Sequence, residues 1–167
     1  MKVLLLALLG TLGALAQKVE IEFDQAVDFS QFKTFAIRGG RLNSKNPSLN
    51  SDLVRKRIDA DIEKYLGAKG LTFVASGASD LNVRYTLGSV RGTQVEAYPA
   101  GWRGWGTRVV RVPFTEGTLV IDVRNPTNRS LVWRAIARED KGDAAHIEGK
   151  LDDMVKKSID KYPPKVK

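Results

Sequence analysis

Two hydrophobic periodicities alternate along the chain. Residues 18–24 alternate strictly between polar and apolar side chains, with Val19, Ile21 and Phe23 on one face, as in a half-buried strand. Further on, the apolar positions recur at helical spacing, and they form one stripe made of Leu49, Leu53, Val54, Ile58, Ile62, Tyr65 and Leu66. This stripe predicts an amphipathic helix, with Ser48 or Asn50 as its cap.

Period-two alternation marks the other strands. A short strand is expected around residues 33–37, ended by Gly39-Gly40 and followed by a polar loop over 38–48. After Gly70 the alternation resumes, and it predicts strands at 71–74, 81–87, 108–114, 118–124 and 131–137. A second helical stripe follows, capped by Asp143 and ended by Pro163-Pro164; its members are Ile147, Leu151, Met154, Val155, Ile159 and Tyr162.

The order of these elements predicts the fold class. Two strands, a helix, several strands joined by short connections and a final helix favour an α+β domain. We expect a mainly antiparallel β-sheet of about five to seven strands, with two α-helices packed on one face. The domain should span residues 17–167, because no internal repeat or linker interrupts it.

The N-terminus has the pattern of a secretory signal peptide over residues 1–16. Lys2 precedes an apolar run at 3–9, and Ala14-Leu15-Ala16 forms a small-x-small cleavage site. This segment is shorter than the roughly 20 residues that span a bilayer. We therefore expect a bacterial periplasmic or secreted protein with no transmembrane segment. We also expect no lipid anchor, because the chain has no cysteine to carry one.

Composition excludes several kinds of chemistry. The chain of 167 residues has no cysteine, which removes disulfides, thiol catalysis and thiolate metal sites. His146 is its one histidine, so multi-histidine metal sites are also excluded. The formal net charge is +8 at pH 7. Outside the cytoplasm, such a charge favours anionic envelope surfaces over nucleic acid as partners.

Several short motifs occur in a specific order over most of the chain. They are residues 28–35 (DFSQFKTF), 65–70 (YLGAKG), 80–85 (DLNVRY), 117–122 (GTLVID) and 131–134 (LVWR), and then Tyr162-Pro163-Pro164. In these motifs the chain resembles DUF4136, a family of exported bacterial proteins of unknown function, many of them lipoproteins. The resemblance implies compartment and fold, and it brings no catalytic residues. Those lipoproteins carry a lipobox cysteine, whereas this chain has Gln17 at the expected mature start.

The most unusual segment is rich in glycine and aromatic residues, at 88–106. Within and beside it, Trp102 and Trp105 lie next to Arg103 and Arg108. Aromatic faces can stack on sugars or insert at a membrane surface, and arginine binds phosphates, so we expect a binding loop here. In the alternative interpretation the segment is a long hairpin loop whose tryptophans fold back onto the sheet edge.

A row of arginines occupies the polar positions of the predicted strands. Arg84, Arg124, Arg134 and Arg138 would share one face of the sheet if their strands are neighbours. That face would be a basic platform for an anionic lipid, a glycolipid or an envelope protein. Alternatively it is a solvated face on which the arginines pair with acids such as Asp122 and Glu139.

Catalytic residues are not evident. His146 lies at a helix start. A carboxylate pair such as Asp80 with Asp122, or Glu96 with Glu116, could cleave a glycosidic bond, but Asp80 and Asp122 also fit turn or surface positions. We predict a non-enzymatic binding or structural module without cofactor or metal, which binds through Arg84, Trp102, Arg103, Trp105, Arg108 and Arg134. The alternative is an envelope glycan hydrolase that uses a carboxylate pair. The oligomeric state stays open, and self-association through a sheet edge is a third possibility.

Overall fold

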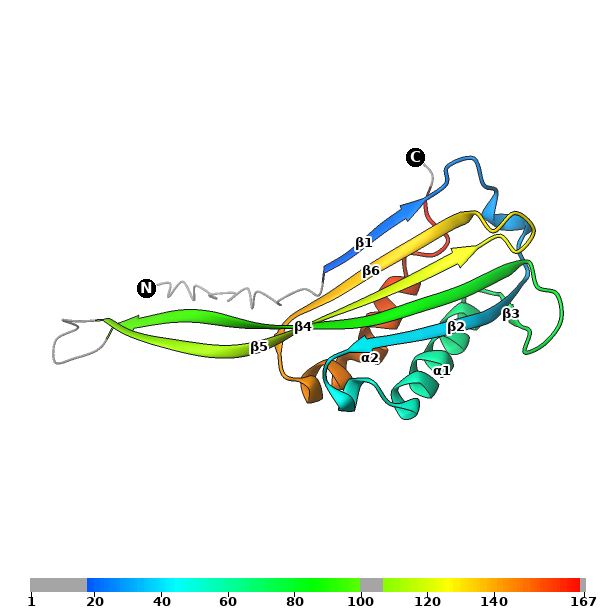
Figure 1. Cartoon of the computed structure of the whole chain (residues 1–167). Coiled ribbons are helices and arrows are strands. Elements are labelled where there is room, and N and C mark those ends of the chain that lie inside the picture. Colours follow the sequence, from blue (N-terminus) through cyan, green and yellow to red (C-terminus); the bar gives the residue numbers. More distant parts are fainter. Residues whose placement is uncertain (1–17, 100–106, 166–167) are drawn as a thin grey trace, which may run out of the picture.

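A six-stranded sheet with two helices on one face forms the body of the protein (Figure 1). The computed structural model describes residues 18–99 and 107–165. The strands lie in the order β1-β6-β5-β4-β2-β3, and their bounds are β1 (Lys18–Phe23), β2 (Thr34–Ser44), β3 (Thr72–Phe73), β4 (Leu81–Pro99), β5 (Thr107–Arg124) and β6 (Leu131–Gly142). Neighbouring strands are antiparallel except that β2 runs parallel to β4 and β3. This confirms the predicted α+β class.

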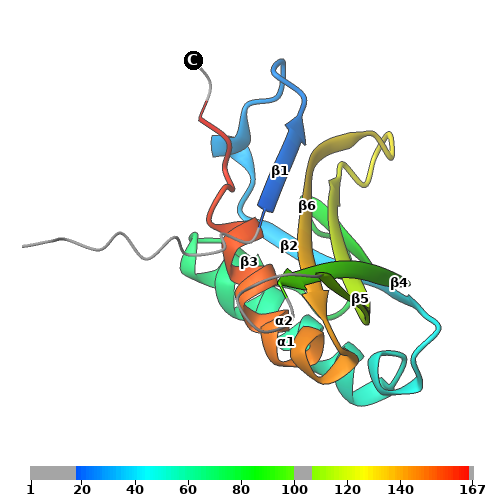
Figure 2. The same cartoon turned by 90° about the vertical axis from the view of Figure 1, so that its left-hand side faces the viewer.

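The two helices cover the same face of the sheet, as Figure 2 shows. They are α1 (Asp52–Ala68) and α2 (Ala144–Ile159), and short 3₁₀ turns lie at Phe29–Gln31 and Pro47–Leu49. Ser51 caps α1 by accepting a hydrogen bond from the Val54 amide, which places the cap one residue beyond the predicted Asn50. Asp143 caps α2, as predicted.

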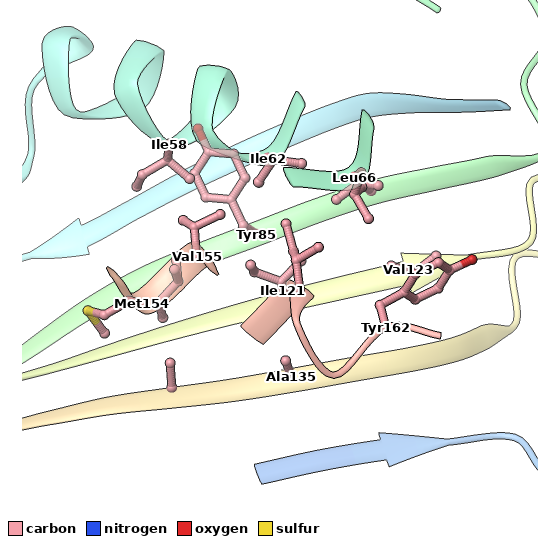
Figure 3. Close-up of a cluster of buried hydrophobic side chains, with 14 of the residues drawn as sticks. Ile58, Ile62, Leu66, Tyr85, Ile121, Val123, Ala135, Met154, Val155 and Tyr162 are labelled. Atoms are coloured by element: carbon pink, nitrogen blue, oxygen red, sulfur yellow. The ribbon is translucent and has the colours of Figure 1, made fainter. Parts of the chain in front are cut away.

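The core lies between the helices and this covered face of the sheet (Figure 3). Alternate strand residues such as Val83 and Leu87 are fully buried, and Figure 3 shows Tyr85, Ile121 and Ala135 among the side chains of this core. The predicted apolar stripes supply the opposite wall through Ile58 and Ile62 of α1 and Met154 and Val155 of α2. Trp133 is also fully buried and meets the ring of Tyr162 edge to face, with centroids 5.6 Å apart.

The prediction of a polar loop over residues 38–48 is wrong, because β2 continues to Ser44. A bulge interrupts the pairing of β2 with β4 between Ile37 and Gly40, after which the ladder resumes. Gly39 has φ +135°, which favours glycine. A Cβ atom on Gly40 would lie 2.1 Å from the ring of Tyr85. The two glycines therefore form a bulge inside the strand and do not end it.

The loop predicted over residues 88–106 is likewise mostly strand. β4 and β5 pair continuously from Asn82 opposite Arg124 to Pro99 opposite Thr107. The pairing of β4 with β2 ends at Ser89 of β4, and the pairing of β5 with β6 ends at Thr115 of β5. Beyond these positions the two strands form a two-stranded arm that extends from the body (Figure 1). The strands predicted at 108–114 and 118–124 are thus one strand.

Some predictions fall on parts of the chain that the structure does not describe. The signal peptide predicted at 1–16 and the residues Trp102, Arg103 and Trp105 lie outside the described residues. Across the described residues, no helix combines the length and apolar character needed to cross a membrane.

Candidate anion-binding groove

The sheet face away from the helices carries charged side chains in register across four strands. Glu22 of β1 lies opposite Arg134 of β6, which lies opposite Asp122 of β5, which lies opposite Arg84 of β4. Arg134 holds Asp122 with two hydrogen bonds, Nε to Oδ1 at 2.6 Å and Nη2 to Oδ2 at 3.0 Å. This bonding raises the pKa of Arg134 above its usual value. From β1 to β5, the charges of this row are therefore mainly paired with one another.

The β1 side of this face is also neutralised by carboxylates. Glu20 pairs with Lys18 at 2.8 Å and with Arg138 at 2.9 Å. The hydrogen bonds from Lys18 and then Arg138 lower the pKa of Glu20 to about 2. Arg138, which sequence analysis placed on a basic platform, thus lies in an ion-paired region made by β1 and β6. We call this the paired region, defined by Lys18, Glu20, Glu22, Arg134 and Arg138.

The other side of the same face is a groove of about 900 Å³ with a strong excess of positive charge. We call it the arginine groove, because the charged residues lining it are Arg38, Arg41, Arg84, Arg124, Arg129 and Asp122. Five guanidinium groups and one carboxylate give the lining a formal charge of +4. Asp122 is the one acid among the described residues that line the groove, and Arg134 already holds it.

The bulge in β2 explains why two arginines of that strand reach the groove. Side chains alternate between the faces of a strand, so Arg38 and Arg41 would point to opposite faces of a regular strand. Ile37 lies opposite Val83, and without a bulge Arg41 would lie opposite Leu87, on the face covered by the helices. The extra residue instead sets Arg41 opposite Thr86, on the open face.

The β5–β6 turn supplies the far wall of the groove. Asn125 and Asn128 stabilise this turn by accepting hydrogen bonds from the amides of Thr127 at 2.8 Å and Ser130 at 2.9 Å. Arg129 has φ +61°, a left-handed conformation at the tip of the turn. The turn therefore carries Arg129 to the lining of the groove.

Within the described part of the chain, protein atoms orient two of the groove arginines and make no hydrogen bond or ion pair with the guanidinium groups of the other three. Arg38 donates from Nη2 to the carbonyl of Gly77. Arg124 donates to the carbonyl of Arg129 and to Asp122, each at 3.3 Å. Among the described residues, the guanidinium groups of Arg41, Arg84 and Arg129 form no hydrogen bond or ion pair. The arrangement can bind anions, because three sets of guanidinium donors face open space beside two arginines of fixed orientation.

The residues predicted as a binding site are only partly brought together. Arg84 lines the groove, whereas Arg134 lies beside it in the pair with Asp122. Arg108 lies on the arm, opposite Tyr98, away from the groove residues of β5. Arg38, Arg41 and Arg129 were not predicted from the sequence as site residues. The signal that could have found Arg41 is the Gly39-Gly40 pair, which can mark a bulge as well as a strand end.

The candidate catalytic residues have separate structural roles. Asp80 accepts hydrogen bonds at 2.9 Å from the amides of Lys33 and Thr34 and from the Thr34 hydroxyl. These bonds, led by that from the Lys33 amide, lower the pKa of Asp80. Asp122 belongs to the groove, and His146 Nε2 lies 3.0 Å from Glu139 Oε1. For Glu96 and Glu116 the structure describes the backbone only. No group of three or more metal-ligating side chains occurs among the described residues.

Comparison with known proteins gives a family and a fold. The family model DUF4136, described as a domain of unknown function, matches residues 19–164. No curated protein matches the sequence.

Solved structures with the same fold come from several bacteria. A PDZ domain protein from Parabacteroides distasonis has a TM-score of 0.62 and 17% identity over 89% of this chain, which spans only 36% of that protein. A PelC dodecamer from Paraburkholderia phytofirmans has a TM-score of 0.51 and 10% identity, covering 86% of this chain and 95% of PelC. A putative neuraminyllactose-binding hemagglutinin homolog from Helicobacter pylori has a TM-score of 0.50 and 8% identity, covering 86% and 92%. Likeness at these identities shows the fold alone.

Proposed function

This chain belongs to the DUF4136 family, and we propose that it is an exported, non-enzymatic module that binds an anionic component of the bacterial cell envelope in its arginine groove. The observation that carries the proposal is the unbalanced charge of the groove, five arginines against one aspartate. Like charges gathered in a concave site repel one another, and an anionic ligand relieves that repulsion.

The contrast with the paired region supports a binding role for the groove. In the paired region, carboxylates of β1 lie within ion-pair distance of the basic side chains, as Glu20 does with Arg138. In the groove, Asp122 is the one such carboxylate among the described residues, and it is held by Arg134 and Arg124. A purely structural surface gains nothing from three arginines that lack partners, whereas a binding site needs available donors.

The compartment is part of the proposal. The signal-peptide pattern of residues 1–16 supports export to the periplasm or beyond. The anions available there include phospholipid head groups, phosphorylated glycolipids and acidic proteins. The proposal contains no catalytic step: in one of the two carboxylate pairs considered for hydrolysis, Asp80 and Asp122 each accept hydrogen bonds within the fold.

Co-sedimentation with vesicles tests the proposed function. The probe is a vesicle made from a bacterial envelope lipid extract, which carries anionic phospholipid and phosphorylated glycolipid; neutral phosphatidylcholine vesicles serve as the reference. The wild-type protein should bind the anionic vesicles at low salt and dissociate as salt is raised. The double variant Arg41→Ala/Arg84→Ala should bind at least about tenfold more weakly, because each lost charged hydrogen bond costs roughly 1.5–3 kcal/mol.

A matched control separates the groove from overall charge. Lys56 and Arg57 are exposed on α1, across the sheet from the groove. The variant Lys56→Ala/Arg57→Ala removes the same two charges and should bind within about twofold of the wild type, a difference of about 0.4 kcal/mol. Equal losses in the two double variants would contradict the proposal, since they would show that net charge alone attracts the vesicles.

A further inference from the structure

We infer that the arginine groove binds a phosphorylated saccharide, either as the head group of a glycolipid or as a free sugar phosphate. The inference rests on the proposed function and narrows its ligand. It depends on three properties of the groove: the available guanidinium groups, the neutral hydrogen-bonding groups beside them and the concave shape of the site.

The guanidinium groups provide the part of the site that binds phosphate. Arg41 comes from β2, Arg84 from β4 and Arg129 from the β5–β6 turn, so a ligand in the groove meets donors from three segments. A phosphate has several acceptor oxygens and pairs with the planar fork of arginine in bidentate fashion. The bonds of Arg38 and Arg124 to backbone carbonyls fix the orientation of two more guanidinium groups beside it.

The neutral groups provide the part that binds sugar. Asn82, Thr86 and Asn125 line the groove among the arginines. The side-chain oxygens of Asn82 and Asn125 accept hydrogen bonds from the Ser79 hydroxyl and the Thr127 amide. Their amide N–H groups, and the Thr86 hydroxyl, have no side-chain partner among the described residues. A sugar hydroxyl accepts hydrogen bonds as well as donating them, so it can use these donors.

Apart from Tyr85, Pro126 is the one apolar residue with a side chain among the described residues that line the groove. Tyr85 lines the groove at its backbone, but its hydroxyl donates to the Arg55 carbonyl at 3.2 Å on the helix side of the sheet. The groove therefore offers little apolar surface for an acyl chain. Its volume of about 900 Å³ lies within the range of roughly 300–1,000 Å³ that is usual for small-molecule sites. A concave polar site of this size fits a saccharide better than the flat surface of a bilayer.

Isothermal titration calorimetry with a matched set of soluble probes tests the inference. The probes are trehalose 6-phosphate, trehalose and inorganic phosphate. The wild-type protein should bind trehalose 6-phosphate at least about tenfold more tightly than either of the others, because that ligand engages both parts of the site. The variant Arg41→Ala/Arg84→Ala should lose this binding, and Lys56→Ala/Arg57→Ala should keep it.

A second variant tests the sugar-binding part separately. Thr86→Val keeps the β-branched shape and removes the hydroxyl. It should weaken binding of trehalose 6-phosphate about three- to tenfold and leave inorganic phosphate binding unchanged, in line with the loss of one hydrogen bond. Circular dichroism should show an unchanged fold.

The outcomes separate the inference from the proposed function. If inorganic phosphate binds as tightly as trehalose 6-phosphate and the groove variant loses both, the inference is overturned and the proposed function stands. The inference is also overturned, and the proposed function stands, if the protein binds only phosphatidylglycerol vesicles and Arg41→Ala/Arg84→Ala abolishes that binding. If the groove variant and the control bind every probe equally, both are overturned. Displacement of envelope-lipid vesicles by trehalose 6-phosphate would support the glycolipid source, and soluble binding without vesicle binding would support the free sugar phosphate.

Discussion

The paired region and the arginine groove lie on the same sheet face, but carboxylates neutralise most of the positive charge only in the paired region. In the paired region, Arg138 and Lys18 both contact Glu20, and Arg134 contacts Asp122. In the groove, Arg41, Arg84 and Arg129 lie beside a single carboxylate that is already held. In both regions the side chains alternate between the two faces of the sheet. What differs is whether a carboxylate within reach is available to each arginine: Asp122 lies opposite Arg84 but is held by Arg134 and Arg124.

This difference separates charges that stabilise the fold from charges available for a ligand. Directly opposite residues of antiparallel strands interact, and opposite charges there contribute favourably. The bulge of β2 adds an arginine to the open face, since it places Arg41 opposite Thr86 and not opposite Leu87 of the covered face. The groove thus owes part of its excess charge to a local irregularity of one strand, and the paired region owes its balance to the carboxylates of β1.

The largest expected effect comes from disturbing the bulge. In Gly40→Ala the new Cβ would lie 2.1–2.6 Å from atoms of the Tyr85 ring, and that buried ring cannot simply move aside. We expect a loss of about 1–3 kcal/mol in the free energy of unfolding, measured by urea denaturation. The control Gly149→Ala on α2 meets no atom within 4 Å and should be neutral or stabilising by up to about 1 kcal/mol.

A double-mutant cycle identifies the cause of this loss. Tyr85→Ala removes the ring that the new Cβ would meet. Adding Gly40→Ala in that background should then cost much less than it does in the wild type. An equal cost in both backgrounds would mean that the contact with Tyr85 is not what requires glycine at this position.

A smaller effect is expected when Asp122, the carboxylate between Arg134 and Arg124, is removed. The side chain of Asp122 is only 16% exposed, and Asp122→Ala would leave Arg134 and Arg124 without their carboxylate. We expect the free energy of unfolding to fall by about 1 kcal/mol, because Arg134 and Arg124 stay partly exposed to water, together with tighter, more salt-sensitive binding of anionic vesicles. Asp153→Ala removes an exposed carboxylate 3.5 Å from Lys157 and should change stability by less than about 1 kcal/mol. Weaker vesicle binding by Asp122→Ala would contradict the assignment of Asp122 as a charge that opposes the ligand.

The smallest effect is the pH dependence of the paired region. The pKa of Glu20 is lowered to about 2 in the folded protein, below its unfolded value, by bonds from Lys18 and Arg138. A depressed carboxyl pKa stabilises the fold above the unfolded pKa, and the contribution is lost as pH falls through the folded pKa. The wild type should therefore exceed Glu20→Gln in urea midpoint above about pH 4.5 and lose this advantage towards pH 2. A constant difference across that range would mean that ionisation of Glu20 is not its source.

Much of the fold could be predicted from local patterns. The stripes of Ile58 and Ile62 and of Leu151 and Val155 identified both helices, and alternation around Val83 identified a strand whose inward side chains are buried. These signals are strong because each lies within one element. The family resemblance, based on short motifs in order, was confirmed by the match over residues 19–164.

The errors occurred where pairing between distant segments overrides local composition. Gly39-Gly40 reads as a strand end, yet parallel pairing with β4 carries β2 on to Ser44. The glycines of 88–99 read as a loop, yet pairing with β5 keeps them in a strand. The groove was found only in part for the same reason, because it joins side chains from β2, β4, β5 and the β5–β6 turn. Arg84 was predicted, but its neighbours Arg38 and Arg41 belonged to the supposed loop.

The most direct test of the central claim is an NMR titration of the isotope-labelled protein with trehalose 6-phosphate, recording backbone amide shifts. Binding in the arginine groove predicts the largest shifts at residues 38–41, 82–86 and 124–129, with the amides of 18–22 and 134–138 nearly unchanged. Largest shifts in the paired region or on the arm, with the groove amides unmoved, would contradict the claim that the unpaired arginines of this sheet face form the binding site.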